Sequence, residues 1–137
     1  MIEKLYIDTN VIIDAVEGRR NIFGKNIGNP AADLFLQAIS CKYELLISSW
    51  MLEELSGLQK LEQSTMFFAM VKAKIIRVTY TPEEKEHAKH RSHEHFDDAL
   101  HIIIAEREGA DCIVTRNTSH FSIINTRIRI RRPEELL

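Results

Sequence analysis

The sequence predicts a three-layer α/β/α sandwich, in which a mostly parallel sheet of about five strands carries helices on both faces. Short apolar runs alternate with longer helical patterns along the chain, and such alternation joins parallel strands through right-handed crossovers. The chain has 137 residues, of which 45% are hydrophobic and 28% charged, a composition typical of one ordinary globular domain. We therefore expect residues 1–137 to form a single domain.

The predicted strands are short apolar segments bounded by polar residues or turns. The first one leads directly into a helical pattern, as the opening of a strand–helix–strand unit does. The five segments cover residues 4–7, 44–48, 75–78, 111–115 and 127–130.

Capping residues mark most of the predicted helices. Asn29 and the proline after it form a helix opening behind a Gly- and Asn-rich loop over residues 17–29, and Ser49 is expected to cap the next helix. Thr81 opens a capping box, and Gly109 closes the last predicted helix. The predicted helices cover residues 10–16, 30–40, 50–60, 64–73, 82–91 and 96–108.

Composition and charge exclude several classes of protein. No run of about 18 apolar residues exists, so no membrane span is expected. The first residues lack the pattern of a signal peptide, which predicts a cytoplasmic location. Lys and Arg number 18 and Asp and Glu 20, a net charge of −2, so any nucleic acid would be bound through a local patch or through metal ions. Cys41 and Cys112 lie in apolar stretches, which favours buried free thiols.

Polar residues follow two of the predicted strands at the edge where a parallel sheet places its functional crevice. Asp8 follows the first strand, with Asn10 in position to cap the helix or orient a neighbour. Thr115, Arg116 and Asn117 follow the fourth strand and supply a hydroxyl, a guanidinium and an amide. Taken alone, Asp8 is equally well explained as a helix cap.

Helical geometry selects one acid from each of two adjacent pairs. Over residues 50–61, Glu54 falls within the apolar stripe and Glu53 outside it, so Glu54 is predicted to point inward and Glu53 into solvent. On the helix over 96–108, Asp98 lies over residues expected to be buried, which favours Asp98 over Asp97 as the inward acid.

Asp8, Glu54, Asp98 and Asn117 come from four segments that are expected to converge at one end of the sheet. Three carboxylates packed together repel one another, and a hard divalent cation such as Mg²⁺ or Mn²⁺ removes that conflict. Oxygen-rich metal sites of this kind suit phosphate substrates.

Four segments in order resemble the motifs of PIN-domain ribonucleases, and together they span nearly the whole chain. They are residues 7–14 around Asp8, 49–55 around Glu54, 98–105 from Asp98, and 109–117 with Phe121. The resemblance implies a Mg²⁺ or Mn²⁺ site at Asp8, Glu54 and Asp98 and endonucleolytic hydrolysis of RNA. Thr115 and Asn117 would position water or a substrate phosphate, with Asn10, Arg116 and His120 as further positioning residues.

A PIN chain of this size is most similar to VapC-type toxins, which implies a homodimer held inactive by a small antitoxin protein. One departure stands out, because many members carry a fourth acid where this chain has Asn117 or His120. Three carboxylates should hold metal less tightly than four, so a weak or inactive PIN-like binding and assembly module is an alternative.

Five histidines near the third motif offer another interpretation, that of a zinc-binding module. Their number beside many charges is also typical of a solvated surface. These histidines are His87, His90, His93, His95 and His101.

The last predicted strand carries arginines on one face, at positions 127, 129 and 131. They are equally consistent with contacts to an RNA backbone and with the protection of an edge strand by charge.

Overall fold

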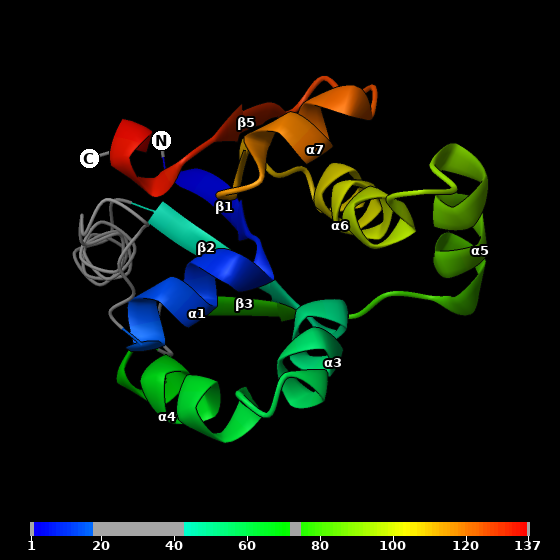
Figure 1. Ribbon diagram of the computed structural model, residues 1–137. Helices are drawn as coiled ribbons and strands as arrows, with labels where there is room; N and C mark the ends of the chain where they lie inside the picture. The colour runs from blue at the N-terminus through cyan, green and yellow to red at the C-terminus, as the bar shows by residue number, and fades with distance from the viewer. Residues whose placement is uncertain (1, 18–42, 72–74, 137) are drawn as a thin grey trace.

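The computed structural model describes residues 2–17, 43–71 and 75–136, and these contain one five-stranded sheet. The strand order is β3-β2-β1-β4-β5, and every neighbouring pair is parallel (Figure 1). The strands are β1 (Glu3–Ile7), β2 (Tyr43–Ser48), β3 (Ile75–Val78), β4 (Cys112–Val114) and β5 (Arg129–Arg131). Because β1 lies in the middle, its carboxyl end meets segments that arrive from both sides of the sheet.

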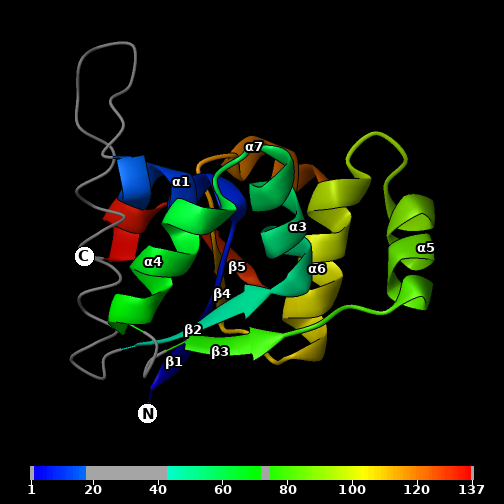
Figure 2. The ribbon, with the colours of Figure 1, turned by 90° about the horizontal axis from the view of Figure 1, so that it is seen from below.

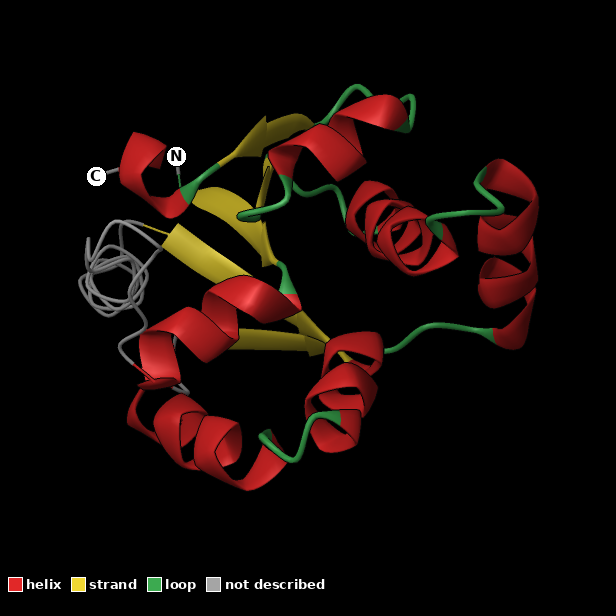
Figure 3. Ribbon diagram, viewed as in Figure 1, coloured by secondary structure: helices red, strands yellow, loops and turns green. Residues whose placement is uncertain are grey.

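Helices cover both faces of the sheet. The described helices are α1 (Thr9–Glu17), α3 (Ser49–Gly57), α4 (Leu61–Val71), α5 (Pro82–Arg91), α6 (Phe96–Arg107) and α7 (Thr118–Ile123), with a 3₁₀ turn η2 (Pro133–Leu136). Helices α1, α3 and α4 pack together on one side, while α6 contacts both α5 and α7 on the other (Figures 1 and 2). Figure 3 shows the resulting layers of helix, sheet and helix. The predicted α/β/α fold with a parallel sheet is confirmed.

The core lies between the sheet and these two helical layers. Strands β1, β2 and β4 are buried on both faces, as expected for a parallel sheet with helices on either side. Helix α6 is buried over the whole run 98–105, which includes two polar residues, Asp98 and His101. Both polar residues belong to the site described below.

The predicted elements agree with the structure to within three residues at either end. The predicted loop over 17–29 and helix over 30–40 lie outside the described residues, apart from Glu17, which ends α1. Cys41 also lies outside them, whereas Cys112 is a buried free thiol whose pKa is raised to about 11 by burial.

One predicted cap was wrong. Ser48, not Ser49, is the N-cap of α3, and its hydroxyl accepts a hydrogen bond from the backbone N–H of Met51. Ser49 is the first helical residue, and its hydroxyl accepts a hydrogen bond from the backbone N–H of Tyr80 at 3.3 Å. Strand β2 therefore passes into α3 without a loop, and α3 starts at the functional edge of the sheet.

Within the described residues, no helix is long and apolar enough to cross a membrane.

Candidate active site

Asp8 lies at the carboxyl end of the central strand and is almost fully buried. Its Oδ1 accepts a hydrogen bond from the backbone N–H of Thr9 at 2.8 Å, and its Oδ2 accepts one from the Thr115 hydroxyl at 2.8 Å. Burial raises the pKa of Asp8, while the charge of His101 and the Thr115 hydrogen bond act in the opposite direction. The fold thus holds a carboxylate, aimed by two donors, where ionisation is costly.

Glu54 reaches the same place from α3. Its Oε1 lies 2.6 Å from both the Thr9 hydroxyl, which donates to it, and His101 Nε2. Burial alone would raise the pKa of Glu54, but its bonds to His101 and Thr9 bring the pKa below the ordinary value. Glu53, the next residue along the chain, is exposed and accepts a hydrogen bond from the Tyr80 hydroxyl. The two acids therefore take the inward and outward positions that the helical pattern predicts.

Asp98 is the third residue of α6 and is 8% exposed. In the part of the chain that the structure describes, no hydrogen bond reaches its carboxylate, and the nearest basic nitrogen is His120 Nδ1 at 3.9 Å. Burial, followed by the negative charges of Asp97 and Asp8, raises the pKa of Asp98 to about 7. This carboxylate lacks the partners that a buried anion requires.

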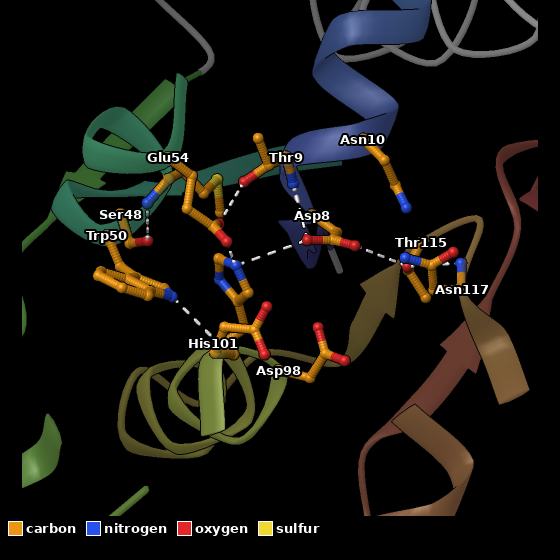
Figure 4. A network of polar contacts seen from close by, with 12 residues as sticks. Asp8, Thr9, Asn10, Ser48, Trp50, Glu54, Asp98, His101, Thr115 and Asn117 are labelled. Carbon is orange, nitrogen blue, oxygen red and sulfur yellow. Dashed lines mark hydrogen bonds and ion pairs between the residues drawn. The ribbon is translucent and has the colours of Figure 1, made fainter. Parts of the chain in front are cut away.

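These acids line one pocket of about 160 Å³ at the carboxyl ends of β1 and β4. Figure 4 shows Asp8 between Glu54 and Asn117, with the Asp98 side chain rising toward them from α6. The residues that line the pocket are Asp8, Thr9, Asn10, Ile13, Glu54, Leu58, Asp97, Asp98 and Asn117. The structure therefore brings together the four residues that the sequence singled out as central.

A buried histidine completes the cluster, and the sequence prediction missed it. His101 is 1% exposed, and its Nε2 lies 2.6 Å from Glu54 Oε1 and 3.5 Å from Asp8 Oδ1 (Figure 4). Its other ring nitrogen, Nδ1, lies 2.7 Å from the Tyr6 hydroxyl, which in turn lies 2.7 Å from the Ser48 hydroxyl. Burial alone would lower the pKa of His101, but the Glu54 hydrogen bond and the nearby acids raise it.

The sequence also places His101 in a group of five histidines typical of a solvated surface, and the structure contradicts that interpretation for His101. His87, His90 and His93 are exposed as expected, whereas His101 lies at the centre of the site. The available signal was its position as the one polar residue within the apolar stretch 99–105.

The remaining predicted positioning residues have different surroundings. Asn10 lines the pocket, and its side-chain oxygen accepts a hydrogen bond from the backbone N–H of Arg116 at 3.3 Å. Thr115 is fully buried and holds Asp8, while His120 is half-exposed beside Asp98. The Arg116 guanidinium does not line the pocket, because it pairs with Asp14 and with Glu134.

A larger hollow of about 460 Å³ lies at the amino ends of β4 and β5. Its main acid, Glu106, is paired with Arg91, and the hollow holds no group of acids comparable with the cluster at the other edge. Among the described residues, the grouped acids that could bind a metal ion therefore lie in the smaller pocket.

The arginines of the last strand lie at the edge of the sheet, since β5 pairs only with β4. Arg129 is exposed and 3.5 Å from Glu3, and Arg131 lies 3.7 Å from Glu135. These pairs agree with the interpretation of a charged, protected edge strand. The possible contact with RNA stays a prediction.

The donor set of the pocket fits a hard divalent cation. Asp8, Glu54 and Asp98 offer carboxylate oxygens, and the amide of Asn117 adds a neutral oxygen at the same opening. Oxygen ligands are those that Mg²⁺ and Mn²⁺ prefer. Asp98 in particular is a buried carboxylate whose charge the described residues leave without a hydrogen bond.

Residues 4–119 match the model of the PIN domain family. The fold is similar to that of VapBC2 from Rickettsia felis bound to a DNA fragment from its promoter, with a TM-score of 0.65, 17% identity, and coverage of 94% of this chain and 98% of that one. It is also similar to VapC20 of Mycobacterium tuberculosis, described as a toxin that cleaves the sarcin–ricin loop, with a TM-score of 0.61, 16% identity, and coverage of 91% and 98%. No curated protein matches the sequence significantly. Because the family match spans most of its length, this chain belongs to the PIN domain family.

Proposed function

We propose that this chain is a divalent-metal-dependent endoribonuclease that hydrolyses phosphodiester bonds in RNA. The observation that carries the proposal is the convergence of Asp8, Glu54 and Asp98, from three separate segments, on one small pocket at the carboxyl edge of a parallel sheet. Membership of the PIN family supports it, as does the fold similarity to VapC20, which is described as a toxin that cleaves the sarcin–ricin loop.

Asp8, Glu54 and Asp98 would hold the ion, Mg²⁺ or Mn²⁺, and together they supply three negative charges. When bound, such an ion activates water for attack on phosphorus and offsets the charge of the leaving oxygen. Thr9 and Thr115 keep Asp8 and Glu54 oriented through their hydroxyls. Asn117 would orient the substrate phosphate from the rim of the pocket, where its side chain is exposed.

Asn10 and Arg116 would act mainly by shaping this rim. The Asn10 side chain holds the backbone of the turn that presents Asn117, because it accepts a hydrogen bond from Arg116 N–H. A direct contact between the Arg116 guanidinium and a phosphate would require it to leave Asp14 and Glu134.

A specific observation favours a second candidate, a PIN-like module with weak or no catalysis. His101 Nε2 lies 2.6 Å from Glu54 Oε1 within the acid cluster, and a protonated imidazole there would offset part of the negative charge that a metal ion would otherwise balance. Asn117 and His120 stand where a fourth acid would increase metal affinity. This candidate predicts the same fold without metal-dependent cleavage.

The similarity to VapBC2 and VapC20 also supports a finer proposal, that the chain is the toxin of a toxin–antitoxin pair. A VapC-type toxin would form a homodimer and would be held inactive by a small antitoxin protein. This proposal depends on the ribonuclease activity of the pocket.

The test is cleavage of total cellular RNA by the purified chain with Mn²⁺, with Mg²⁺ and with EDTA. We expect metal-dependent fragments with defined ends, and a loss of at least about a hundredfold in Asp8→Asn, since one ligand and its charge are removed. Glu53→Gln is the matched control, because Glu53 lies next to Glu54 and points into solvent. Cleavage that persists in EDTA, or in Asp8→Asn, would rule the proposed mechanism out.

A further inference from the structure

A second group of potential metal ligands lies beside the acid pocket and contains two imidazoles. One ligand atom each from His95, Asp98 and His120 lies within 4.8 Å of the other two. His95 is the N-cap residue of α6, and Asp98 lies three residues later in the first turn. His120 comes from α7, which packs against α6.

The two imidazole rings already face one another. Their centroids are 4.9 Å apart with an angle of 23° between the ring planes, and His120 Nδ1 lies 3.9 Å from Asp98 Oδ2. A metal bound at about 2.0–2.2 Å by three ligands separates the ligand atoms by roughly 3–3.5 Å. Imidazole binds a metal through the lone pair in its ring plane, so the stacked rings must rotate before both can bind one ion. The His120 side chain is 50% exposed, which leaves it free to rotate without a change in the backbone.

The state of the Asp98 side chain indicates a cation beside its carboxylate. The residue is 92% buried, and no described group donates a hydrogen bond to its carboxylate. A buried carboxylate in this state is unstable unless a positive charge joins it. The two imidazoles beside it can bring one by binding a metal ion together with the carboxylate.

We propose that His95, Asp98 and His120 form a cation site for a nitrogen-preferring divalent ion of the Zn²⁺ class. Two neutral imidazoles and one carboxylate are a ligand set that Zn²⁺ uses with three protein ligands, and imidazole also suits Co²⁺ and Ni²⁺. Mg²⁺ is discriminated against, because it takes oxygen ligands and keeps its water. This site goes beyond the proposed nuclease centre, with which it shares the ligand Asp98 and which it adjoins at His120.

The chemistry of position 120 separates the two kinds of site. An acid at this position would add another oxygen ligand to the acid pocket. His120 offers a ring nitrogen instead, which favours softer ions. His120→Asp should therefore exchange the preference, with lower affinity for Zn²⁺ and higher affinity for Mn²⁺.

The test is titration of the metal-free full-length chain with Zn²⁺ by calorimetry, and with Co²⁺ by visible absorption, whose bands report nitrogen ligation. We expect one Zn²⁺ to bind per chain. Mg²⁺ should not displace it, and the Asp8→Asn variant should still bind it. His95→Gln and His120→Gln should each weaken binding at least about tenfold. His93→Gln, an exposed histidine outside the cluster, is the matched control and should bind as the wild type does.

Nitrogen-detected NMR of the histidine side chains gives a readout that does not depend on affinity. Zn²⁺ should shift the ring nitrogens of His95 and His120 and leave those of His87 and His90 unchanged. Absence of Zn²⁺ binding, or binding that both glutamine variants retain, would overturn the proposal. The nuclease proposal is judged separately, by Mn²⁺ binding and RNA cleavage that depend on Asp8.

Discussion

Asp98 shows most clearly how the site conflicts with the stability of the fold. Its carboxyl pKa is raised to about 7 from the usual value of 3.8, first by burial and then by Asp97 and Asp8. A folded-state pKa above the unfolded one means that the contribution of this group to stability is full below about pH 4. The contribution is lost as the pH rises toward about 7, where Asp98 ionises in the folded chain.

Replacement of Asp98 by an uncharged amide should therefore stabilise the metal-free protein at neutral pH. We expect Asp98→Asn to raise the free energy of unfolding by about 1–2 kcal/mol above pH 7 and to change it little at pH 4. Urea unfolding in EDTA at the two pH values measures this. Glu94→Gln, an exposed acid just before α6, should stay within about 0.5 kcal/mol of the wild type. If Asp98→Asn were instead less stable than the wild type above pH 7, the ionised Asp98 carboxylate would not be a destabilising group in the metal-free fold.

The acids of the site were predictable from sequence because their positions follow from local geometry. The end of a buried strand marks Asp8, and the helical period separates Glu54 from Glu53. His101 was not predictable in the same way, because α6 is buried on all sides and periodicity cannot tell one side from another. The partners of Arg116 were not predictable either. They are Asp14 and Glu134, two acids that are distant in sequence from each other.

Among the helices, α6 and its C-cap Glu108 are followed by a residue whose backbone conformation favours glycine. Gly109 has φ +68°, and a Cβ placed there would meet no atom within 4 Å. The only cost of a side chain is thus the left-handed backbone conformation, about 1–2 kcal/mol. Gly57, the last residue of α3, also has open space but no positive φ.

The two glycines should respond to alanine with opposite signs. Gly109→Ala should lower the free energy of unfolding by about 1 kcal/mol, and Gly57→Ala should raise it slightly, because alanine favours the helix. Denaturant unfolding of the two variants side by side decides this. Equal changes in both variants would show that backbone conformation is not what selects glycine at position 109.

The shortest helices of the fold could not be predicted from the sequence. Helix α7 has six residues with mixed polarity, and η2 has four, so neither carries a full helical period of apolar residues. Helix α5, with its capping box at Thr81, was predicted to the residue. Serine is a favourable N-cap residue at either position 48 or 49. Ser48 takes this role because strand β2 ends there.

At the scale of the whole molecule, Arg116 connects three parts of the chain. It follows β4, and its guanidinium pairs with Asp14 of α1 at 3.0 Å and with Glu134 of η2. Asp14 is 2% exposed, and the Arg116 guanidinium offsets the charge of its carboxylate. The C-terminal segment is thereby tied to the helix that begins at the active site.

Replacement of Arg116 should therefore lower the free energy of unfolding. Arg116→Ala should cost about 2–4 kcal/mol, because a buried carboxylate loses a charged partner. Arg129→Ala, which removes an exposed arginine 3.5 Å from Glu3, should cost less than about 1 kcal/mol. A stable Arg116→Ala protein with weakened RNA binding would instead assign this arginine to the substrate phosphate.

Calorimetric titration of the metal-free chain with Mn²⁺ would show whether the acid pocket binds a divalent ion. We expect binding by the wild type and by Glu53→Gln, and its loss in both Asp8→Asn and Asp98→Asn, because these two buried carboxylates converge on one pocket. If the wild type fails to bind Mn²⁺ at millimolar concentrations, or if binding survives both substitutions, the pocket is not the proposed metal site.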